Sequence, residues 1–288
     1  MKTQIEPTEV GTINSLRAKA TPQETRQEML RLSARGYVQI RQILVQLPDR
    51  EKERSSVISP IVSQRKHRAL ILYLLLLTCW PWLAERKLPL QSEVWIRALS
   101  TDRGLTWTGP TLSRAWQDLE MLGLVTRERE ERLLRVKPRR EDGCEEYDPP
   151  AGRRDRWNTY FIIPDRFWTD ELFATLSLPA LVMLLVVAKE TNKNAECWLT
   201  YDNCEEWYGL KSQTVRKGVK ELEEKELLHR RPESVVAPLS PTGMTTRMWY
   251  SLTGDFGSES RRALRNKAVS EMGIRLNKKS VRGKEVSV

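Results

Sequence analysis

The clearest periodic pattern in the chain lies between Lys211 and Arg231. At a helical step of about 100° per residue, Val215, Val219 and Leu222 share one narrow apolar face. The opposite face carries polar and basic side chains, namely Gln213, Arg216, Lys217 and Lys220. The pattern predicts a helix that packs with one face and exposes positive charge and an amide with the other. Ser212 is expected to cap the first turn, because a serine hydroxyl accepts a hydrogen bond from a backbone amide there.

The segments on either side predict a helix before this one and two strands after it. Residues 202–209 form a short helical pattern with Asp202 as the expected N-cap and Gly209 at the stop. Residues 227–231 change to an extended pattern, and a loop with Pro, Ser and Gly separates them from a returning strand at 247–252. The predicted order is helix, turn, helix and a two-stranded wing.

An earlier stretch repeats this order. Placing Thr111 on Thr214 aligns, without a gap, Leu112 with Val215, Trp116 with Val219, Asp118 with Glu221, and Leu119 with Leu222. The first copy is preceded by an apolar helix at 63–82, a short strand at 88–90 and a helix at 92–99, and the third helix opens at Thr108. Its exposed face is less basic, with Ser113, Arg114 and Gln117. Residues 165–177 link the two copies.

The wing of the first copy is expected to be long. Residues 132–137 predict its first strand and 157–163 its second, with a charged loop between them. The loop has basic ends and an acidic middle, so it either lies along phosphates or forms a solvated loop.

The two ends of the chain carry different signals. Thr21, Pro22 and Glu24 form a capping box, and apolar positions continue to Leu47, with Gly36 as a break and Pro48 as a stop. This predicts a helical arm that either dimerises the protein or packs on its own chain. The other end is a basic tail that either adds phosphate contacts or only solubilises the chain, and its cations are Arg261, Arg262, Arg265, Lys267, Arg275, Lys278, Lys279, Arg282 and Lys284.

Composition narrows the classes of function. The 288 residues carry 48 Lys and Arg against 38 Asp and Glu, a net charge of +10 that favours polyanionic partners such as nucleic acid. Four cysteines without a CxxC pair and two histidines predict neither a metal site nor a disulfide framework, and no cofactor is expected. Known catalytic motifs are missing, so an enzyme is not expected. Several tryptophans fall at positions expected to be buried, namely Trp95, Trp116, Trp157, Trp198 and Trp249.

Membrane insertion and export are not expected either. The apolar run within 63–82 is shorter than the roughly 20 residues that cross a bilayer, and Pro81 closes it. The first ten residues are mixed polar and acidic, unlike a signal peptide. The expected location is the cytoplasm, on nucleoid or plasmid DNA.

The stretch TVRKGVKELEEKELLHR, residues 214–230, resembles the recognition helix and first wing strand of bacterial winged helix-turn-helix regulators. The resemblance implies a mainly α fold with small β wings and two tandem winged helix-turn-helix domains, at 63–167 and 168–256. An N-terminal helical arm and linker would occupy 1–62, and the basic tail 257–288. Lysines and glutamates four residues apart are also typical of a merely solvated helix face, which is the alternative for this stretch.

The function implied by this resemblance is sequence-specific binding of double-stranded DNA. Base edges would be read by Gln213, Arg216, Ser212 and Thr214, and phosphates held by Lys211, Lys217, Lys220, Arg230, Arg231 and Arg247. Ser113, Arg114 and Gln117 would form the weaker face of the first copy. A transcriptional regulator is expected, and a plasmid or phage replication initiator that binds repeated origin sites is the alternative. A homodimer would form through the N-terminal arm or the first domain.

Overall fold

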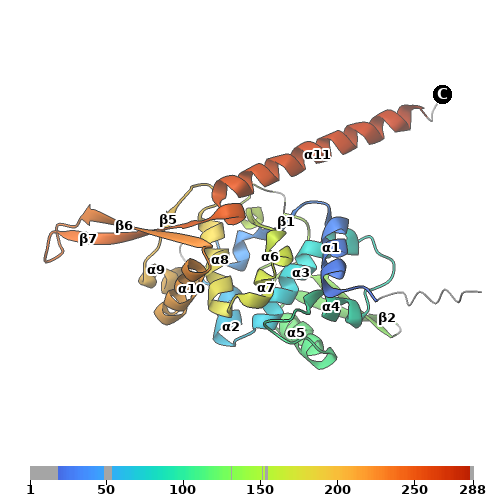
Figure 1. Cartoon of the computed structure of the whole chain (residues 1–288), viewed down its shortest axis with the longest axis horizontal. Helices are drawn as coiled ribbons and strands as arrows, with labels where there is room; N and C mark the ends of the chain where they lie inside the picture. Colours follow the sequence, from blue (N-terminus) through green and yellow to red (C-terminus); the bar gives the residue numbers. More distant parts are fainter. Residues whose placement is uncertain (1–18, 49–53, 131, 151, 153–154, 286–288) are drawn as a thin grey trace, which may run out of the picture.

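The computed structural model describes residues 19–48, 54–130, 132–150, 152 and 155–285, with side chains up to residue 271. These residues form mostly helices, with three small antiparallel sheets (Figure 1). The expected mainly α fold with small β elements is confirmed.

The first copy begins with the buried helix α3, His67–Leu83. The prediction that Pro81 closes this segment is wrong, because the helix continues through Pro81 to Leu83. It is followed by α4 (Ser92–Leu99), α5 (Gly109–Met121) and a hairpin of β2 (Val125–Glu130) and β3 (Leu133–Pro138). Helix α5 begins after Thr108, as predicted, and Thr108 caps it in a capping box with Thr111. The expected strand at 88–90 is wrong, because these residues have no strand partner.

The second copy has the same order of three helices and a hairpin, with one additional strand, β5 (Cys197–Trp198), after its first helix. Its elements are α8 (Leu178–Glu190), β5, α9 (Tyr201–Tyr208), α10 (Ser212–Glu224), β6 (Leu228–Val236) and β7 (Met244–Leu252). The middle helices are both 8 residues long, and the third helices are both 13. Asp202 is not the N-cap of α9, because Thr200, two residues earlier, occupies that position and its hydroxyl accepts a hydrogen bond from the Asn203 amide.

The internal repeat extends to individual hydrogen bonds. After the third helix, Gly123 and Glu226 occupy aligned positions and both have left-handed backbone, with φ of 73° and 56°. The next amides, of Leu124 and Leu227, each donate to the leucine carbonyl five residues earlier at 2.9 Å. Equal turns at aligned positions show that both copies leave the third helix and enter the hairpin in the same way.

Aligned acidic residues hold each third helix to the start of its first helix. In the first copy, Asp118 pairs with Lys66, the N-cap of α3, at 2.5 Å. In the second, Glu221 accepts a hydrogen bond of 2.8 Å from the backbone N–H of Ser177, the N-cap of α8. The carboxylate also adds favourable negative charge at a helix N-terminus.

The N-terminal arm is only partly helical. The capping box at Thr21 opens α1, Pro22–Ser33, as expected. The predicted continuation to Leu47 is wrong, because Gly36 turns the chain with a φ of 78° and Tyr37–Arg41 forms strand β1. Strand β1 is buried on both faces. Its aromatic and β-branched residues favour a strand in such surroundings. The short helices η1 (Gln42–Leu44) and α2 (Ile58–Ser63) follow.

The predicted long wing of the first copy is also wrong. Strand β4, Tyr160–Pro164, pairs with β1, whereas β3 pairs with β2 in a short hairpin. The connection before β4 returns to the body, where Glu141 and Arg41 form a fully buried ion pair at 2.8 Å. A buried acid needs such a partner, so this part of the loop is neither solvated nor available to phosphates. Arg153 and Arg154 lie outside the described residues.

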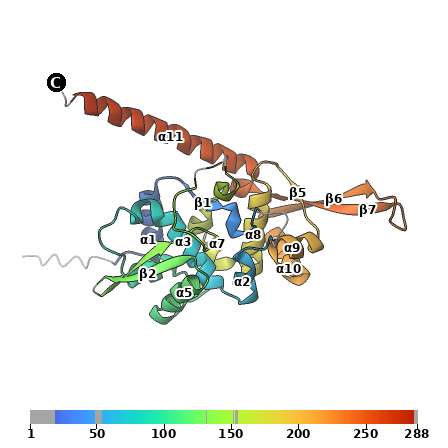
Figure 2. The same ribbon diagram turned by 180° about the vertical axis from the view of Figure 1, so that it is seen from behind.

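Short helices α6 (Arg166–Thr169) and α7 (Leu172–Thr175) link the copies, and α6 buries Phe167 and Trp168. After the second copy, η3 (Gly254–Phe256) leads into α11, Ser258–Glu285, which projects beyond the body. Figures 1 and 2 place α11 along one side of the molecule, and α5 and α10 along the opposite side. Within the described part of the chain, none of the helices has both the length and the apolar character that crossing a bilayer requires.

Candidate nucleic-acid interface

Helix α10 has the two faces that its sequence predicts. Val215, Val219 and Leu222 are buried, whereas the polar and basic stripe is exposed. That stripe consists of Gln213, Arg216, Lys217 and Lys220. Ser212 does not cap the helix, because Lys211 occupies the N-cap position and no side chain closes the first turn. No described side chain therefore accepts a hydrogen bond from the amides of this turn.

A glycine lets α10 approach α8 closely. A Cβ atom at Gly218 would lie 2.4 Å from the backbone oxygen of Pro179 and 2.7 Å from the Met183 side chain. The alignment of the two copies places Ala115 at the equivalent position of α5. Sequence reasoning missed this role of Gly218, although a glycine on the apolar side of a helical pattern is a signal for close packing.

The exposed stripe has few internal partners. Among the described residues, the side chains of Gln213 and Lys217 form no hydrogen bond or ion pair. The Lys220 side chain has only a solvent-exposed contact with Glu224, at 3.6 Å. Such exposed pairs contribute little. Glu221, four residues after Lys217, turns away from the stripe to Ser177. The face is therefore not neutralised by its own acidic residues.

Tyr201 at the start of α9 supports Arg216. The guanidinium carbon of Arg216 lies 5.6 Å from the centre of the Tyr201 ring, within cation–π range. Both side chains are exposed. The ring restricts where the guanidinium can lie while leaving its N–H groups free to bind a partner.

The predicted phosphate contacts of the hairpin are not on one surface. Arg230 pairs with Glu223 of α10 at 3.0 Å, whereas the next residue, Arg231, pairs with Glu196 at 2.8 Å and lies over Trp249. Successive strand residues point to opposite faces, which explains the separation. Arg247 lies over the Trp198 ring, 4.7 Å from its centre.

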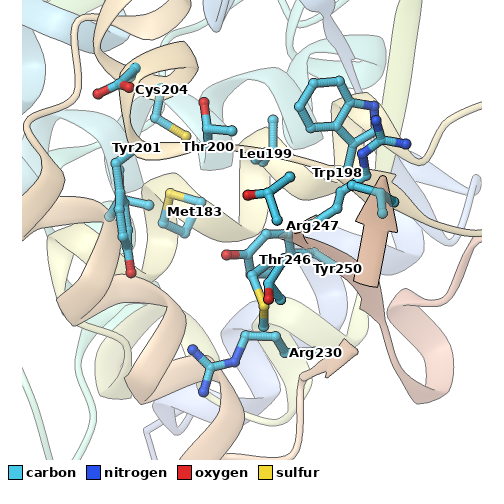
Figure 3. A pocket seen from close by; sticks show the side chains of 15 residues that line it. Met183, Trp198, Leu199, Thr200, Tyr201, Cys204, Arg230, Thr246, Arg247 and Tyr250 are labelled. Carbon is cyan, nitrogen blue, oxygen red and sulfur yellow. The ribbon is translucent and has the colours of Figure 1, made fainter. Parts of the chain in front are cut away.

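A cavity of about 480 Å³ opens between the hairpin and the start of α9. In Figure 3, Trp198 and Arg247 lie together on one side of it, Arg230 lies on another, and Thr246 and Tyr250 lie between them. Arg231 does not line it. The lining arginines and the hydroxyls of two threonines give this groove hydrogen-bond donors suited to anionic groups. These residues are Arg230, Arg247, Thr200 and Thr246. Trp198 and Trp157 were both expected in the core, but they are 40% and 39% exposed. The Trp157 ring lies beside Arg140.

The first copy presents a weaker surface. Ser113, Arg114 and Gln117 are exposed on α5, as predicted, and Arg114 is the only cation among them. Helices α5 and α10 lie along the same edge of the molecule (Figures 1 and 2). The structure therefore places the two third helices on a common side.

Other chemistry has little support in the described residues. No group of three or more His, Cys, Asp or Glu side chains is placed there to bind a metal ion. Burial raises the pKa of the Cys197 and Cys204 thiols to about 12, so neither is a thiolate near neutral pH.

Comparison with protein-family models, curated proteins and solved structures found no match to this chain. Its function is therefore inferred from the exposed charges, the contacts and the repeated order of elements.

Proposed function

We propose that this protein binds double-stranded DNA in a sequence-specific manner through two winged helix-turn-helix units. The observation that carries the proposal is the exposed polar and basic stripe of α10, in which, among the described residues, only Lys220 contacts an acidic side chain. Helix α10 follows a short helix and precedes a hairpin. This order is that of a winged helix, whose third helix enters the major groove. The net charge of +10 supports a polyanionic partner.

Each part of the surface has a distinct role in this mechanism. Gln213 and Arg216 read base edges, because an amide pairs bidentately with adenine and a guanidinium with guanine. The half-buried Ser212 and Thr214 flank them in the first turn. Phosphates are held by Lys211, Lys217, Lys220, Arg230 and Arg247. Arg231 does not line the groove and is paired with Glu196, so it contributes only to the general positive field.

The first copy contacts the same duplex more weakly through Ser113, Arg114 and Gln117. The common edge of α5 and α10 supports contact with one continuous duplex. Helix α1 buries Met29 and Leu30 in the core of its own chain, so a homodimer through the arm would use the outer side of α1. DNA on the nucleoid or a plasmid, in the cytoplasm, is the proposed location.

Selection from a randomised duplex pool tests the proposal. The parent should enrich a motif, and Arg216→Ala should weaken binding to it by about 1–3 kcal/mol and relax one base position. Lys220→Ala should weaken binding evenly across sequences and reduce the salt slope by about one. Arg31→Ala is the matched control, because Arg31 is an exposed arginine of α1, far from α10.

Two outcomes would contradict the proposal. Absence of duplex binding would exclude the function, and binding that depends only on salt, with no enriched motif, would exclude sequence specificity. The arrangement of an enriched motif also separates the two biological roles. A single or inverted site favours a transcriptional regulator, whereas tandem direct repeats favour a plasmid or phage replication initiator.

A further inference from the structure

The hairpin of the second copy extends well beyond the sheet that supports it. Strands β6 and β7 pair over nine residues each, from Leu228 and Leu252 to Val236 and Met244. Strand β5 supports β7 only at Tyr250 and Trp249. The outer part is therefore a two-stranded ribbon that projects from the body (Figure 1).

Charge and exposure divide this ribbon into two parts. Its base carries Arg230, Arg231 and Arg247, whereas residues 232–246 contain no lysine or arginine and a single acid, Glu233. At the tip, Val236 and Met244 face each other across the strands and are 75% and 44% exposed. Leu239, in the connecting loop, is fully exposed. Projecting edges of soluble proteins usually carry charges, so an apolar tip indicates a contact surface.

The loop at the tip has a defined shape. The Ala237 amide donates to the Gly243 carbonyl at 2.8 Å, the Ser240 amide to Ala237 at 2.9 Å, and the Gly243 amide to Ser240 at 3.0 Å. Prolines at 238 and 241 restrict the backbone on both sides of Leu239. Leu239 is thus held at the end of the ribbon before any partner binds. Binding therefore costs little conformational entropy of the loop.

We propose that Leu239 is an apolar wedge that enters the minor groove beside the major groove occupied by α10, separates two base pairs and bends the duplex. This inference rests on the proposed function. Apolar side chains of minor-groove proteins commonly unstack a base step and kink DNA toward the major groove. An uncharged tip gains little binding free energy from phosphates, whereas contact with the base stack favours its binding.

The surroundings of the tip favour DNA as its partner. On one face of the ribbon, the tip pair Val236 and Met244 continues the row that includes Arg230 and Tyr250, and Arg230 contacts α10 through Glu223. The apolar tip is therefore continuous with the proposed DNA surface. Nine residues at about 3.3 Å each span roughly 30 Å, enough to reach past one strand to a minor groove about 6 Å wide.

Bending of the selected motif tests the wedge. Fluorescence transfer between dyes at the two ends of the duplex should rise when the parent binds, and 2-aminopurine at the contacted step should brighten as it unstacks. Leu239→Ser should lose most of both signals and keep the preference for the bases read by α10. Folding is not at risk, because Leu239 is fully exposed. Val269→Ser, an exposed apolar position on α11, should match the parent.

Failure of the wedge differs from failure of the proposed function. Motif binding without bending, or equal bending by Leu239→Ser, would overturn the wedge and leave DNA recognition intact. Leu239→Ser could instead lose self-association, measured by sedimentation without DNA, while DNA bending stays unchanged. That result would assign the tip to a second copy of the chain and would also overturn the wedge. Absence of any duplex binding by the parent would overturn both proposals.

Discussion

At the scale of single residues, Gly218 is the position where α10 depends most on the absence of a side chain. Overpacking a core costs about 1–3 kcal/mol, and alanine in place of glycine in a helix gains about 1 kcal/mol. We expect overpacking to dominate in Gly218→Ala, because the nearest atom is the backbone oxygen of Pro179, which cannot rotate away. Urea unfolding should show a less stable protein.

Gly109→Ala is the control for this change. Gly109 is the first residue of α5, and a Cβ atom there would meet nothing within 4 Å. The variant should be as stable as the parent or slightly more stable. Equal stability of both alanine variants would show that α8 and α10 are not in close contact at Gly218.

His67 makes stability depend on pH. Burial, with a smaller effect from Arg68, lowers the pKa of His67 to about 4 from an ordinary 6.5. Between these values the unfolded chain binds a proton that the folded chain does not, so acidification destabilises the fold by up to about 1.4 kcal/mol per pH unit. His67→Gln should lose less unfolding free energy than the parent between pH 6.5 and 4, in urea titrations at each pH. A parallel loss in both proteins would contradict the lowered pKa.

Asp165 should act in the opposite direction. Burial raises the pKa of its carboxyl to about 7 from an ordinary 3.8, and one carboxyl oxygen is buried without a hydrogen-bond partner. The folded chain binds more protons in this window, so the contribution of Asp165 to stability is present at low pH and lost as pH rises toward 7. Asp165→Asn should therefore lose more stability than the parent on acidification from pH 7 to 4. A smaller loss than in the parent would exclude a raised pKa.

At the scale of elements, the first turn of α11 is fastened to the end of α8 by Arg261. This side chain is 1% exposed and donates to the Ala188 carbonyl and the Thr191 hydroxyl, both at 2.7 Å. Burial, and to a lesser extent Arg265, lowers its pKa to about 10, so it stays protonated at neutral pH. The sequence places Arg261 in a basic tail expected either to add phosphate contacts or to solubilise the chain, and its burial excludes both roles for this residue.

Removing the Arg261 guanidinium should destabilise the protein. Arg261→Met would leave carbonyls at the end of α8 unpaired and lower the unfolding free energy by about 2–3 kcal/mol. The neighbouring Arg262 is exposed, so Arg262→Met should remain within about 0.5 kcal/mol of the parent. Urea denaturation measures the unfolding free energy of both variants. Similar values for the two would mean that α11 is only loosely attached.

Elements defined by their own residues were predictable, whereas those defined by distant partners were not. The cap at Thr21, the start of α5 at Thr108 and the two faces of α10 follow from local spacing. Strand β1 depends on β4, more than one hundred residues later, and their pairing changes both the arm and the wing of the first copy. The exposure of Trp198 likewise depends on Arg247 of the neighbouring strand β7, because the indole lies beside that guanidinium instead of in the core.

At the scale of the whole molecule, the two copies share one hydrophobic core that includes both Leu70 of α3 and Leu185 of α8. The Trp168 indole donates to the Thr78 hydroxyl at 3.2 Å, and the Asn192 side chain donates to the Tyr160 carbonyl at 2.9 Å. A Cβ atom at Gly209, in the turn before α10, would lie 2.3 Å from the hydroxyl oxygen of Ser59, in the segment before the first copy. Such contacts fix α5 relative to α10.

A shared core predicts that the two copies unfold together. Leu185→Ala removes a fully buried side chain from α8 and should cost about 2–5 kcal/mol. In native-state hydrogen exchange, protection of the slowest amides of α3, in the other copy, should fall by the same free energy as protection of those of α8. Leu75→Ala in α3 is the reciprocal test, since Leu75 is also buried. A loss confined to residues 168–256 in the first variant, and to residues 63–167 in the second, would show two independent domains, and α5 and α10 could then change their separation on DNA.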